Sequence, residues 1–194
     1  PIAQETPGVE MMRGKQSASD PLMGLWAGHF AFGRSQESAF RAIRNCNIFI
    51  DNVDQVLDMS DEEKARWKAE VRFLKAYYHF LLLRQYGSIP IVDKNLPISA
   101  DVEEVRVNQE PVDTVFNYIV NTIDQAMEDL PERVTSNNEL GRVDRVIAAA
   151  IKSRVLLYAA SPLYNGNSEY YETFTDKEGN KLFNTTYDPE KWKR

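Results

Sequence analysis

The sequence is poor in the residues that most often carry catalysis, metal binding or covalent cross-links. It has one cysteine, Cys46, and only two histidines in 194 residues, so an intrachain disulfide is excluded and few metal or nucleophile arrangements remain. It also lacks a glycine-rich phosphate loop. We therefore predict no cofactor, no metal site and no catalytic residue, and we expect the protein not to be an enzyme.

Long apolar runs and clusters of positive charge are absent as well. No stretch approaches the roughly 20 apolar residues of a membrane-spanning helix, and none resembles a signal peptide. The net charge is −6 and the basic residues are scattered, which argues against nucleic acid as a partner. With 43% hydrophobic residues, the chain can still build one substantial core.

Two helices are predicted in the first half of the chain. The first spans Gln36 to Leu57 with Ser35 as its cap, because apolar residues recur every three or four positions. These residues are Ala39, Ile43, Cys46, Ile50, Val53 and Leu57. Ser60 and Glu63 then fit a capping box that starts the second helix. The short connection between the two helices predicts an antiparallel hairpin.

The second helix continues to Tyr86, where Gly87 and Pro90 stop it. In the stretch from Glu70 onward most of its circumference is apolar. One narrow polar stripe remains, made of Lys68, Arg72, Lys75 and His79. A helix of this kind has partners on two sides, so we predict that it is an inner element of a helical stack.

Two further helices are predicted, from Pro111 to Pro131 and from Asp144 to Ala160, with Arg142 bonding carbonyls or a carboxylate near the start of the latter. Residues 88–109 form an extended connection that could hold one or two short strands, and residues 176–180 form a hairpin turn. The fold class is therefore all-α, with tetratricopeptide-like stacked helical hairpins, long extended connections and small β-hairpin elements. The sequence shows no clean 34-residue repeat.

The last residues read as the start of another helix, with Asp188 as N-cap and Pro189 in the first turn. We interpret the chain as a fragment that lacks residues at both ends. Within residues 1–194 we expect one domain, divided into an irregular ligand-side segment (1–35), a helical scaffold (36–162) and a turn-rich segment that leads into a truncated helix (163–194).

Four segments together carry a family resemblance. They are Arg44 to Asn52 (RNCNIFIDN), Glu70 to Pro90 (EVRFLKAYY through YGSIP), the helix closing in AMEDLP at Pro131, and Gly141-Arg142 followed by RVLLYAASPLYN up to Asn165. In this order and spacing the chain resembles the SusD/RagB family of Bacteroidetes outer-membrane proteins. Its single domain would then be a SusD-like domain fragment.

The resemblance implies a lipid-anchored protein at the cell surface that binds a glycan or other nutrient without cleaving it. The partner it implies is a SusC-like TonB-dependent transporter that imports the ligand. The N-terminal cysteine that would carry the lipid is absent from this chain. The lipid anchor is thus an expectation from the family alone.

Aromatic side chains before the first helix are the predicted ligand contacts, because rigid aromatic faces suit the apolar side of a sugar ring. They are Trp26, His29 and Phe30, with Arg13 and Arg34 nearby. The same rings could instead plug the end of the helix stack. A second cluster, Tyr164, Tyr170 and Tyr171, leaves the same two alternatives open.

Three functions stay open at this stage. The first is glycan or nutrient binding beside an outer-membrane transporter. The second is a helical-repeat scaffold that binds only proteins. The third is a glycoside hydrolase, since paired carboxylates that meet only in the fold would not be visible in the sequence. Cys46 on an apolar stripe reads as a buried inert thiol, and His79 as a surface or hydrogen-bonded structural residue.

Overall fold

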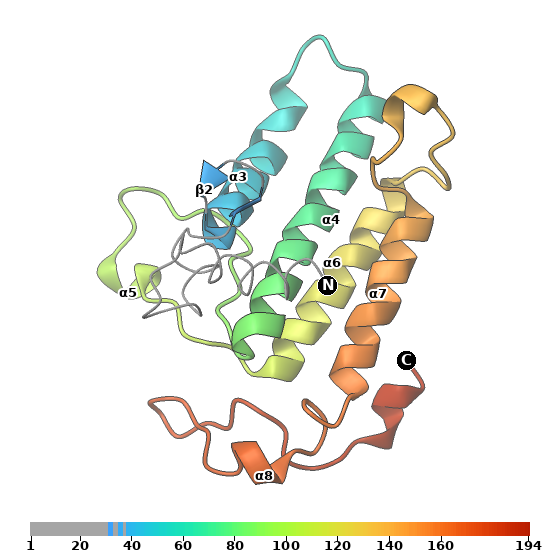
Figure 1. Cartoon of the computed structure of the whole chain (residues 1–194). Coiled ribbons are helices and arrows are strands. Elements are labelled where there is room, and N and C mark those ends of the chain that lie inside the picture. Colours follow the sequence, from blue (N-terminus) through green and yellow to red (C-terminus); the bar gives the residue numbers. More distant parts are fainter. Residues whose placement is uncertain (1–30, 33–34, 37) are drawn as a thin grey trace.

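Four long helices form the frame of the described part of the chain, which in this computed structural model comprises residues 31–32, 35–36 and 38–194. They are α3 (Ala39–Asn52), α4 (Asp61–Tyr86), α6 (Val112–Asp129) and α7 (Arg145–Ala160). Each runs antiparallel to the one before it, and they stand side by side in chain order (Figure 1). These stacked helical hairpins confirm the predicted all-α, tetratricopeptide-like class.

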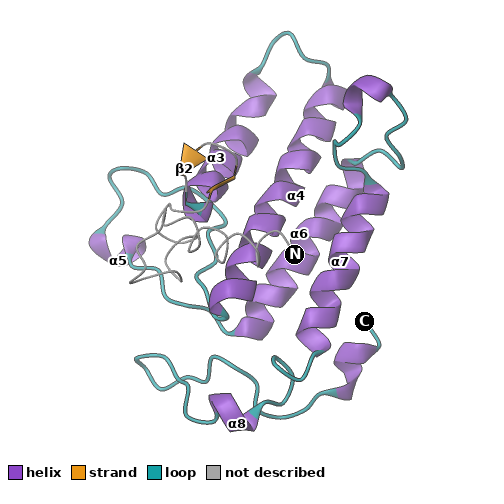
Figure 2. Cartoon of the chain, viewed as in Figure 1, coloured by secondary structure: helices purple, strands orange, loops and turns teal. Residues whose placement is uncertain are grey.

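The shorter elements lie before the first helix and in the connections (Figure 2). An antiparallel pair of two-residue strands, β1 (Ala31–Phe32) and β2 (Ser35–Gln36), precedes α3. The others are η2 (Val53–Gln55), α5 (Val102–Val105), η3 (Asn137–Glu139), α8 (Ser168–Tyr171) and η4 (Pro189–Trp192).

The first long helix is shorter than predicted at both ends. Gln36 belongs to β2, and Ser38 rather than Ser35 is the N-cap, with its hydroxyl accepting from the Arg41 N–H at 3.1 Å. At its other end α3 passes into η2, and Leu57 is 99% exposed instead of joining the apolar stripe. A residue four positions farther along stays on the same face only while the helix continues.

The second helix has both of its predicted ends. Ser60 and Glu63 form the capping box: the Glu63 N–H donates to the Ser60 hydroxyl at 3.2 Å, and the Ser60 N–H donates to the Glu63 carboxylate at 3.1 Å. Gly87, at φ +74°, ends the helix, and its N–H donates to the Leu83 carbonyl. A Cβ at Gly87 would lie 2.7 Å from the Phe183 ring, so this position requires glycine for a second reason.

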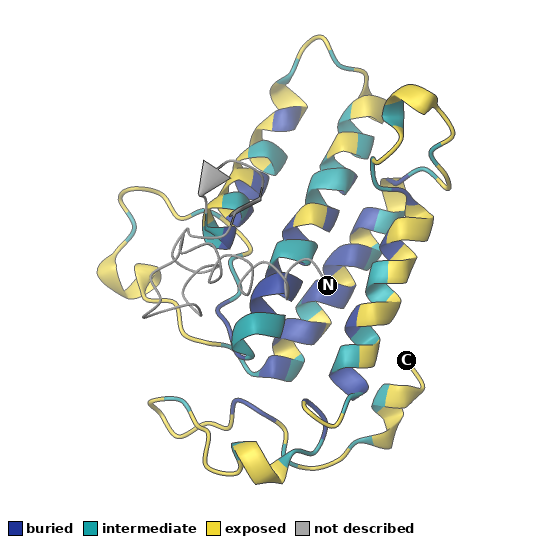
Figure 3. Ribbon diagram, in the orientation of Figure 1, coloured by how far each residue is buried: buried dark blue, intermediate teal, exposed yellow. Residues whose placement is uncertain are grey.

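Helix α4 lies between α3 and α6 and is buried toward both, as predicted for an inner helix (Figures 1 and 3). Phe80 to Leu83 are almost completely buried. The predicted polar stripe is only partly on the surface, because Lys75 and His79 are buried. Other buried core residues come from α3, α6 and α7, among them Ile43, Val115, Ile119, Ile123, Ala148 and Val155.

The connection between α4 and α6, for which one or two short strands were left open, contains no strand in residues 88–110; a single short helix, α5, forms there. Its two ends are tied to each other. The Glu110 N–H donates to the Ile89 carbonyl at 3.0 Å, and the Ser88 hydroxyl donates to the Glu110 carbonyl at 2.6 Å.

Residues 161–194, here called the basal segment, fold back beneath the helices (Figure 1). The predicted hairpin turn is present as one antiparallel bridge between Thr175 and Lys181. The Asp176 carboxylate closes the turn by accepting from the Asn180 N–H at 2.8 Å. Asp188 caps the next turn as predicted, although that turn, η4, is a 3₁₀-helix.

Candidate functional site

The five residues predicted as ligand contacts, Arg13, Trp26, His29, Phe30 and Arg34, lie outside the described residues. Their proposed role stays a prediction. The second aromatic cluster, in the basal segment, is fully described, and it separates into a buried part and an exposed part.

The buried part is a path of rings that begins in the helical core. Phe116 of α6 meets Tyr164 edge-on at a centroid distance of 5.2 Å, and Tyr164 lies nearly parallel to Phe183 at 6.3 Å. Phe183 in turn stacks on Tyr171 at 3.8 Å. Burial raises the pKa of Tyr164 to about 12. Of the two alternatives left open for Tyr164, the packed structural role is the one that this geometry supports.

The exposed part of the path ends in two rings at the surface. Tyr170 is 68% exposed and Phe174 is 46% exposed. Both meet Tyr171 edge-on, at 6.4 and 6.3 Å, and Phe174 also meets Phe183 at 5.5 Å. Phe174 was not among the predicted site residues. Phe174 precedes the predicted hairpin turn and Phe183 follows it. This position beside a turn was the only sequence signal that one of the two rings could face solvent.

Backbone contacts hold the basal segment against the helices. The Val112 N–H at the start of α6 donates to the Leu182 carbonyl at 2.9 Å. The Asn165 amide donates to the Asp188 carbonyl and accepts from the Asp188 N–H, both at 2.8 Å. These paired hydrogen bonds hold the two ends of the basal segment together. The exposed rings therefore lie on a loop whose ends are fixed by hydrogen bonds.

A polar groove of about 340 Å³ opens between the start of α6 and the basal segment. Its lining is Pro111, Asp113, Lys181, Leu182, Phe183, Asn184, Thr185 and Thr186. Phe183 belongs both to this groove and to the ring path. A lining that combines hydroxyl and amide groups with an aromatic ring is suited to hydrogen bonding a ligand while contacting its apolar face.

A cluster of polar side chains, Lys75 of α4, Tyr118 of α6 and Asp93 of the connection, is engaged in hydrogen bonds within the chain. The Lys75 ammonium donates to the Asp93 carboxylate at 2.9 Å, and the Tyr118 hydroxyl donates to the same oxygen at 2.9 Å. Burial opposes ionisation of Asp93, but these two hydrogen bonds hold its pKa below the usual range. Burial and the nearby carboxylate raise the pKa of Tyr118.

His79 lies in the same cluster and has a hydrogen bond at each ring nitrogen. Its Nε2 accepts from the Val92 N–H at 3.2 Å, so Nδ1 carries the proton and donates to the Lys75 carbonyl at 2.8 Å. Burial lowers the pKa of His79 to about 4. The residue is therefore a hydrogen-bonded structural histidine, one of the two roles predicted for it.

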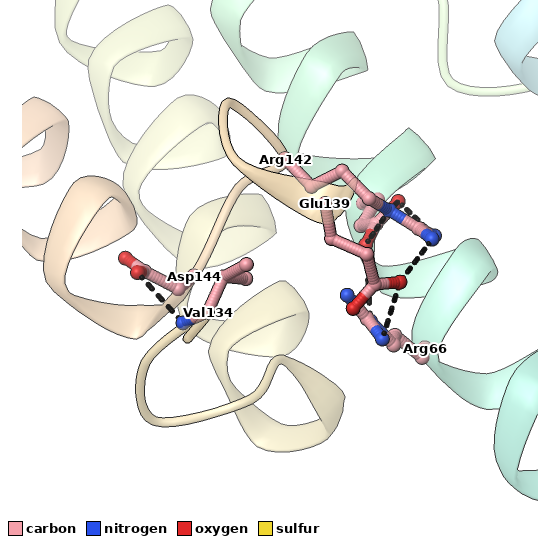
Figure 4. Close-up of polar contacts among 6 residues, drawn as sticks. Arg66, Val134, Glu139, Arg142 and Asp144 are labelled. Atoms are coloured by element: carbon pink, nitrogen blue, oxygen red, sulfur yellow. Dashed lines mark hydrogen bonds and ion pairs between the residues drawn. The ribbon is translucent and has the colours of Figure 1, made fainter. Parts of the chain in front are cut away.

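Arg142, predicted to bond carbonyls or a carboxylate, binds two carboxylates (Figure 4). Its guanidinium donates to both oxygens of Glu70, the shortest contact being 2.9 Å, and to Glu139 at 2.8 Å. Arg66 contacts the same two carboxylates, at 3.3 and 3.1 Å, and the Arg142 guanidinium lies over the Trp67 ring at 5.3 Å. The network joins α4 to the connection that precedes α7.

We expect Arg142→Ala to lower the free energy of unfolding by about 1–2 kcal/mol, because the largely buried Glu70 carboxylate loses its bidentate donor and keeps only Arg66 as a partner. Urea unfolding followed by circular dichroism measures the change. Arg106→Ala is the matched control: the ion pair of Arg106 with Glu103 is exposed on both sides, so a change within about 0.5 kcal/mol is expected. Equal effects of the two variants would contradict a structural role for the network.

Metal binding and thiol chemistry have little support in the part of the chain that is described. No three His, Cys, Asp or Glu side chains there are grouped so as to hold a metal ion. Cys46 is buried as predicted, and burial raises the pKa of its thiol to about 11, which disfavours the reactive thiolate. None of the helices described combines the length and the apolar character needed to cross a membrane.

Comparison with known proteins supplies the family. Residues 29–157 match the SusD-like family described as "Starch-binding associating with outer membrane". The chain belongs to the SusD-like family. This match covers α3, α4, α6 and most of α7, and the first three segments quoted for the resemblance fall within it, whereas the fourth continues beyond it to Asn165.

Relatives of the SusD-like chain agree with this assignment. It is 24% identical over 148 residues to the starch-binding protein SusD of Bacteroides thetaiotaomicron, covering 75% of this chain and 23% of that protein. The solved structure of BT4246 is 40% identical with a TM-score of 0.72, covering 80% of this chain and 27% of that one. A SusD-like protein from Bacteroides fragilis has 28% identity and a TM-score of 0.61, covering 74% and 25%.

The SusD-like chain thus spans about a quarter of the length of the relatives it matches. Proteins of this family bind carbohydrate at the outer-membrane surface of Bacteroidetes. The exposed rings Tyr170 and Phe174 lie beyond residue 157, outside the stretch that matches the family. They belong to a part of the chain that the family match does not describe.

Proposed function

We propose that this protein binds a glycan, without cleaving it, at the outer-membrane surface and delivers it to a SusC-like TonB-dependent transporter. The observation that carries the proposal is the family match over 29–157, together with a solved relative at 40% identity. An N-terminal lipid anchor outside this chain would hold the protein at the membrane. The helical frame then serves to position irregular segments that contact the ligand.

Residues before the first helix are our proposed primary contacts. Trp26, His29 and Phe30 would stack on sugar rings, and Arg13 and Arg34 would bond hydroxyl groups. This assignment rests on the residue types and on their place before the helical frame, since ligand sites often lie in loops carried by a rigid scaffold.

A binding role without hydrolysis is supported by how the described carboxylates are used. A glycosidase needs a general acid with a raised pKa next to a second carboxylate. Glu70 and Glu139 come together, but both are held by Arg142 and Arg66. Hydrogen bonding from Arg66 holds the pKa of Glu139 below its usual value, which is the wrong direction for a general acid.

We expect Trp26→Ala to weaken glycan binding about tenfold, because a stacked ring commonly contributes this much to a sugar complex. Affinity electrophoresis of the full-length protein against a panel of polysaccharides finds the ligand, and isothermal titration with its oligosaccharides measures the loss. Trp192, 53% exposed on η4, is the matched control, and Trp192→Ala should bind as the wild type does.

Several results would contradict this proposal. If Trp26→Ala folds normally and binds with unchanged affinity, Trp26 is not a contact. If the wild type retains no polysaccharide of the panel, the scaffold that binds only proteins becomes the better reading. Release of reducing sugar from a bound glycan would instead favour the hydrolase.

A transporter partner can be tested separately. Affinity purification of the full-length protein from its own outer membranes, solubilised in mild detergent, should recover a TonB-dependent transporter in a stoichiometric amount. Recovery of the protein alone under conditions that preserve other outer-membrane complexes would contradict delivery to such a partner.

A further inference from the structure

The two exposed rings of the basal segment, Tyr170 and Phe174, pack against other aromatic rings. Tyr171 stacks on the buried Phe183, and both Tyr170 and Phe174 pack edge-on against Tyr171. Contact with rings that are themselves packed into the core limits the motion of the exposed ones. Rings ordered in advance lose little conformational entropy when a ligand stacks on them.

The backbone that carries these rings is also braced. The Asn167 side chain accepts from the Tyr170 N–H at 3.0 Å, at the first turn of α8. On the other side, the Leu182 N–H points to the Phe174 carbonyl at 3.5 Å, next to the bridge between Thr175 and Lys181. Both exposed rings therefore project from turns whose conformation is set by local hydrogen bonds.

The polar groove lies next to the exposed rings, because one of its lining residues supports the rings and another contacts the neighbour of Tyr171. Phe183 supports Tyr171 and Phe174 and also lines the groove. Lys181 lines the groove and contacts Glu172, the neighbour of Tyr171, at 3.5 Å. A ligand that contacts both the rings and the groove would meet Asn184, Thr185 and Thr186 in the groove.

Charge in the groove is balanced, which bears on the class of ligand. The Lys181 ammonium is paired with Glu172 at 3.5 Å, and the Asp113 carboxylate is paired with Lys191 at 2.5 Å. The remaining polar side chains of the lining are one amide and two hydroxyls. The Asn184 side-chain oxygen accepts from the Thr186 N–H at 2.9 Å and the Thr185 hydroxyl accepts from the Lys181 ammonium at 3.3 Å, so the amide NH₂ and the hydroxyl protons are the groups that can donate to a ligand. An anionic sugar would need an unpaired cation here, whereas uncharged hydroxyl groups can bond to amide and hydroxyl side chains.

We propose that Tyr170, Phe174 and the adjoining groove form a contact site for a neutral glycan, made of residues other than those proposed before the first helix. The inference rests on the proposed function, since it takes glycan as the ligand. It adds a second contact site on the protein and predicts that the glycan is uncharged. A chain of sugars that touches two places on one protein binds more tightly than either place alone would bind it.

The test begins with the full-length wild-type protein in affinity electrophoresis against neutral and acidic polysaccharides, the latter carrying uronate or sulfate groups. The bound polysaccharide is then used with Tyr170→Ala and Phe174→Ala. We expect retention of a neutral polysaccharide, and about tenfold weaker binding for each variant. Tyr170→Phe, which keeps the ring, should bind within about twofold of the wild type.

Two controls distinguish the loss of a ligand contact from a loss of folded structure in a variant. Trp192→Ala removes a comparably exposed ring that lines a different groove, beside α7, and should leave affinity unchanged. Thermal unfolding of Tyr170→Ala and Trp192→Ala should match that of the wild type, because these side chains are largely exposed. Phe174→Ala, which loses its ring contacts with Tyr171 and Phe183, should unfold at a somewhat lower temperature but still cooperatively.

The outcomes distinguish this inference from the broader proposal. Wild-type binding that is unchanged by both ring substitutions would overturn the basal site and leave glycan binding intact. Retention of acidic polysaccharides only would overturn the prediction that the glycan is uncharged. A wild type that retains none of the panel would contradict both this inference and the proposed function.

Discussion

Acidification from pH 7 to pH 4 is expected to cost the folded protein roughly 3 kcal/mol through His79 alone. Burial lowers the pKa of this residue from its ordinary value of 6.5 to about 4. Between those two pH values the unfolded chain carries a proton on the imidazole that the folded protein does not carry. Each pKa unit corresponds to about 1.4 kcal/mol, so stability falls progressively across this window and the His79 contribution is exhausted below pH 4.

The structural reason lies in the hydrogen bond from Val92. Protonated Nε2 cannot accept, so the Val92 N–H loses its partner and a charge appears in a fully buried position close to the Lys75 ammonium. The Asp93 carboxylate lies nearby and partly offsets this cost. Its own pKa is held low, so its protonation weakens the fold only at lower pH.

The measurement is urea unfolding at several pH values between 7 and 4, for the wild type and for His79→Gln. The glutamine does not titrate in this range, and its amide oxygen can still accept a hydrogen bond. We expect it to be less stable than the wild type at pH 7 but to lose much less stability on acidification. Because the comparison subtracts every other titrating group, parallel pH profiles for the two proteins would refute the assignment to His79.

Gly166→Ala is expected to lower the free energy of unfolding by about 2–4 kcal/mol. Gly166 has φ +83°, a conformation that costs other residues about 1 kcal/mol. A Cβ there would also lie 2.7 Å from the backbone N and Cα of Tyr187. The paired hydrogen bonds between Asn165 and Asp188 hold these two stretches together, so relief requires a backbone shift.

Gly179→Ala is the matched control for this substitution. Gly179 has nearly the same conformation, φ +87°, but no atom lies within 4 Å of its Cβ position. Only the conformational cost of about 1 kcal/mol remains. Urea unfolding of both variants, with hydrogen exchange of the basal segment, measures the difference. Similar losses for the two alanines would mean that the close approach to Tyr187 does not constrain the segment.

Local signals predicted the helical frame well where the responsible contacts are themselves local. The start of α4 follows from Ser60 and Glu63, three residues apart, and its end follows from Gly87. Pro111 and Asp144 similarly mark the starts of α6 and α7. Caps of this kind depend on hydrogen bonds within one turn, so no information about the rest of the chain is needed.

Predictions based on periodicity alone were less reliable. The apolar stripe suggested that the first helix reaches Leu57, whereas α3 ends five residues earlier and Leu57 is exposed. The polar stripe of α4 left both a surface role and a hydrogen-bonded structural role open for His79. Lys75 and His79 are in fact buried, because Asp93 and Val92 from the following connection supply their partners, and partners that distant in sequence leave no periodic signal.

The sequence by itself determined the all-α class, the ends of the second helix and the family, because these depend on local hydrogen bonds and on the order of short segments. Only the tertiary structure decided which aromatic rings are available to a ligand. Tyr164 and Tyr170 are six residues apart and chemically alike, yet the first packs against Phe116 in the core and the second faces solvent. Exposure is set by what the rest of the chain places over a side chain, and the side chain's own type does not carry that information.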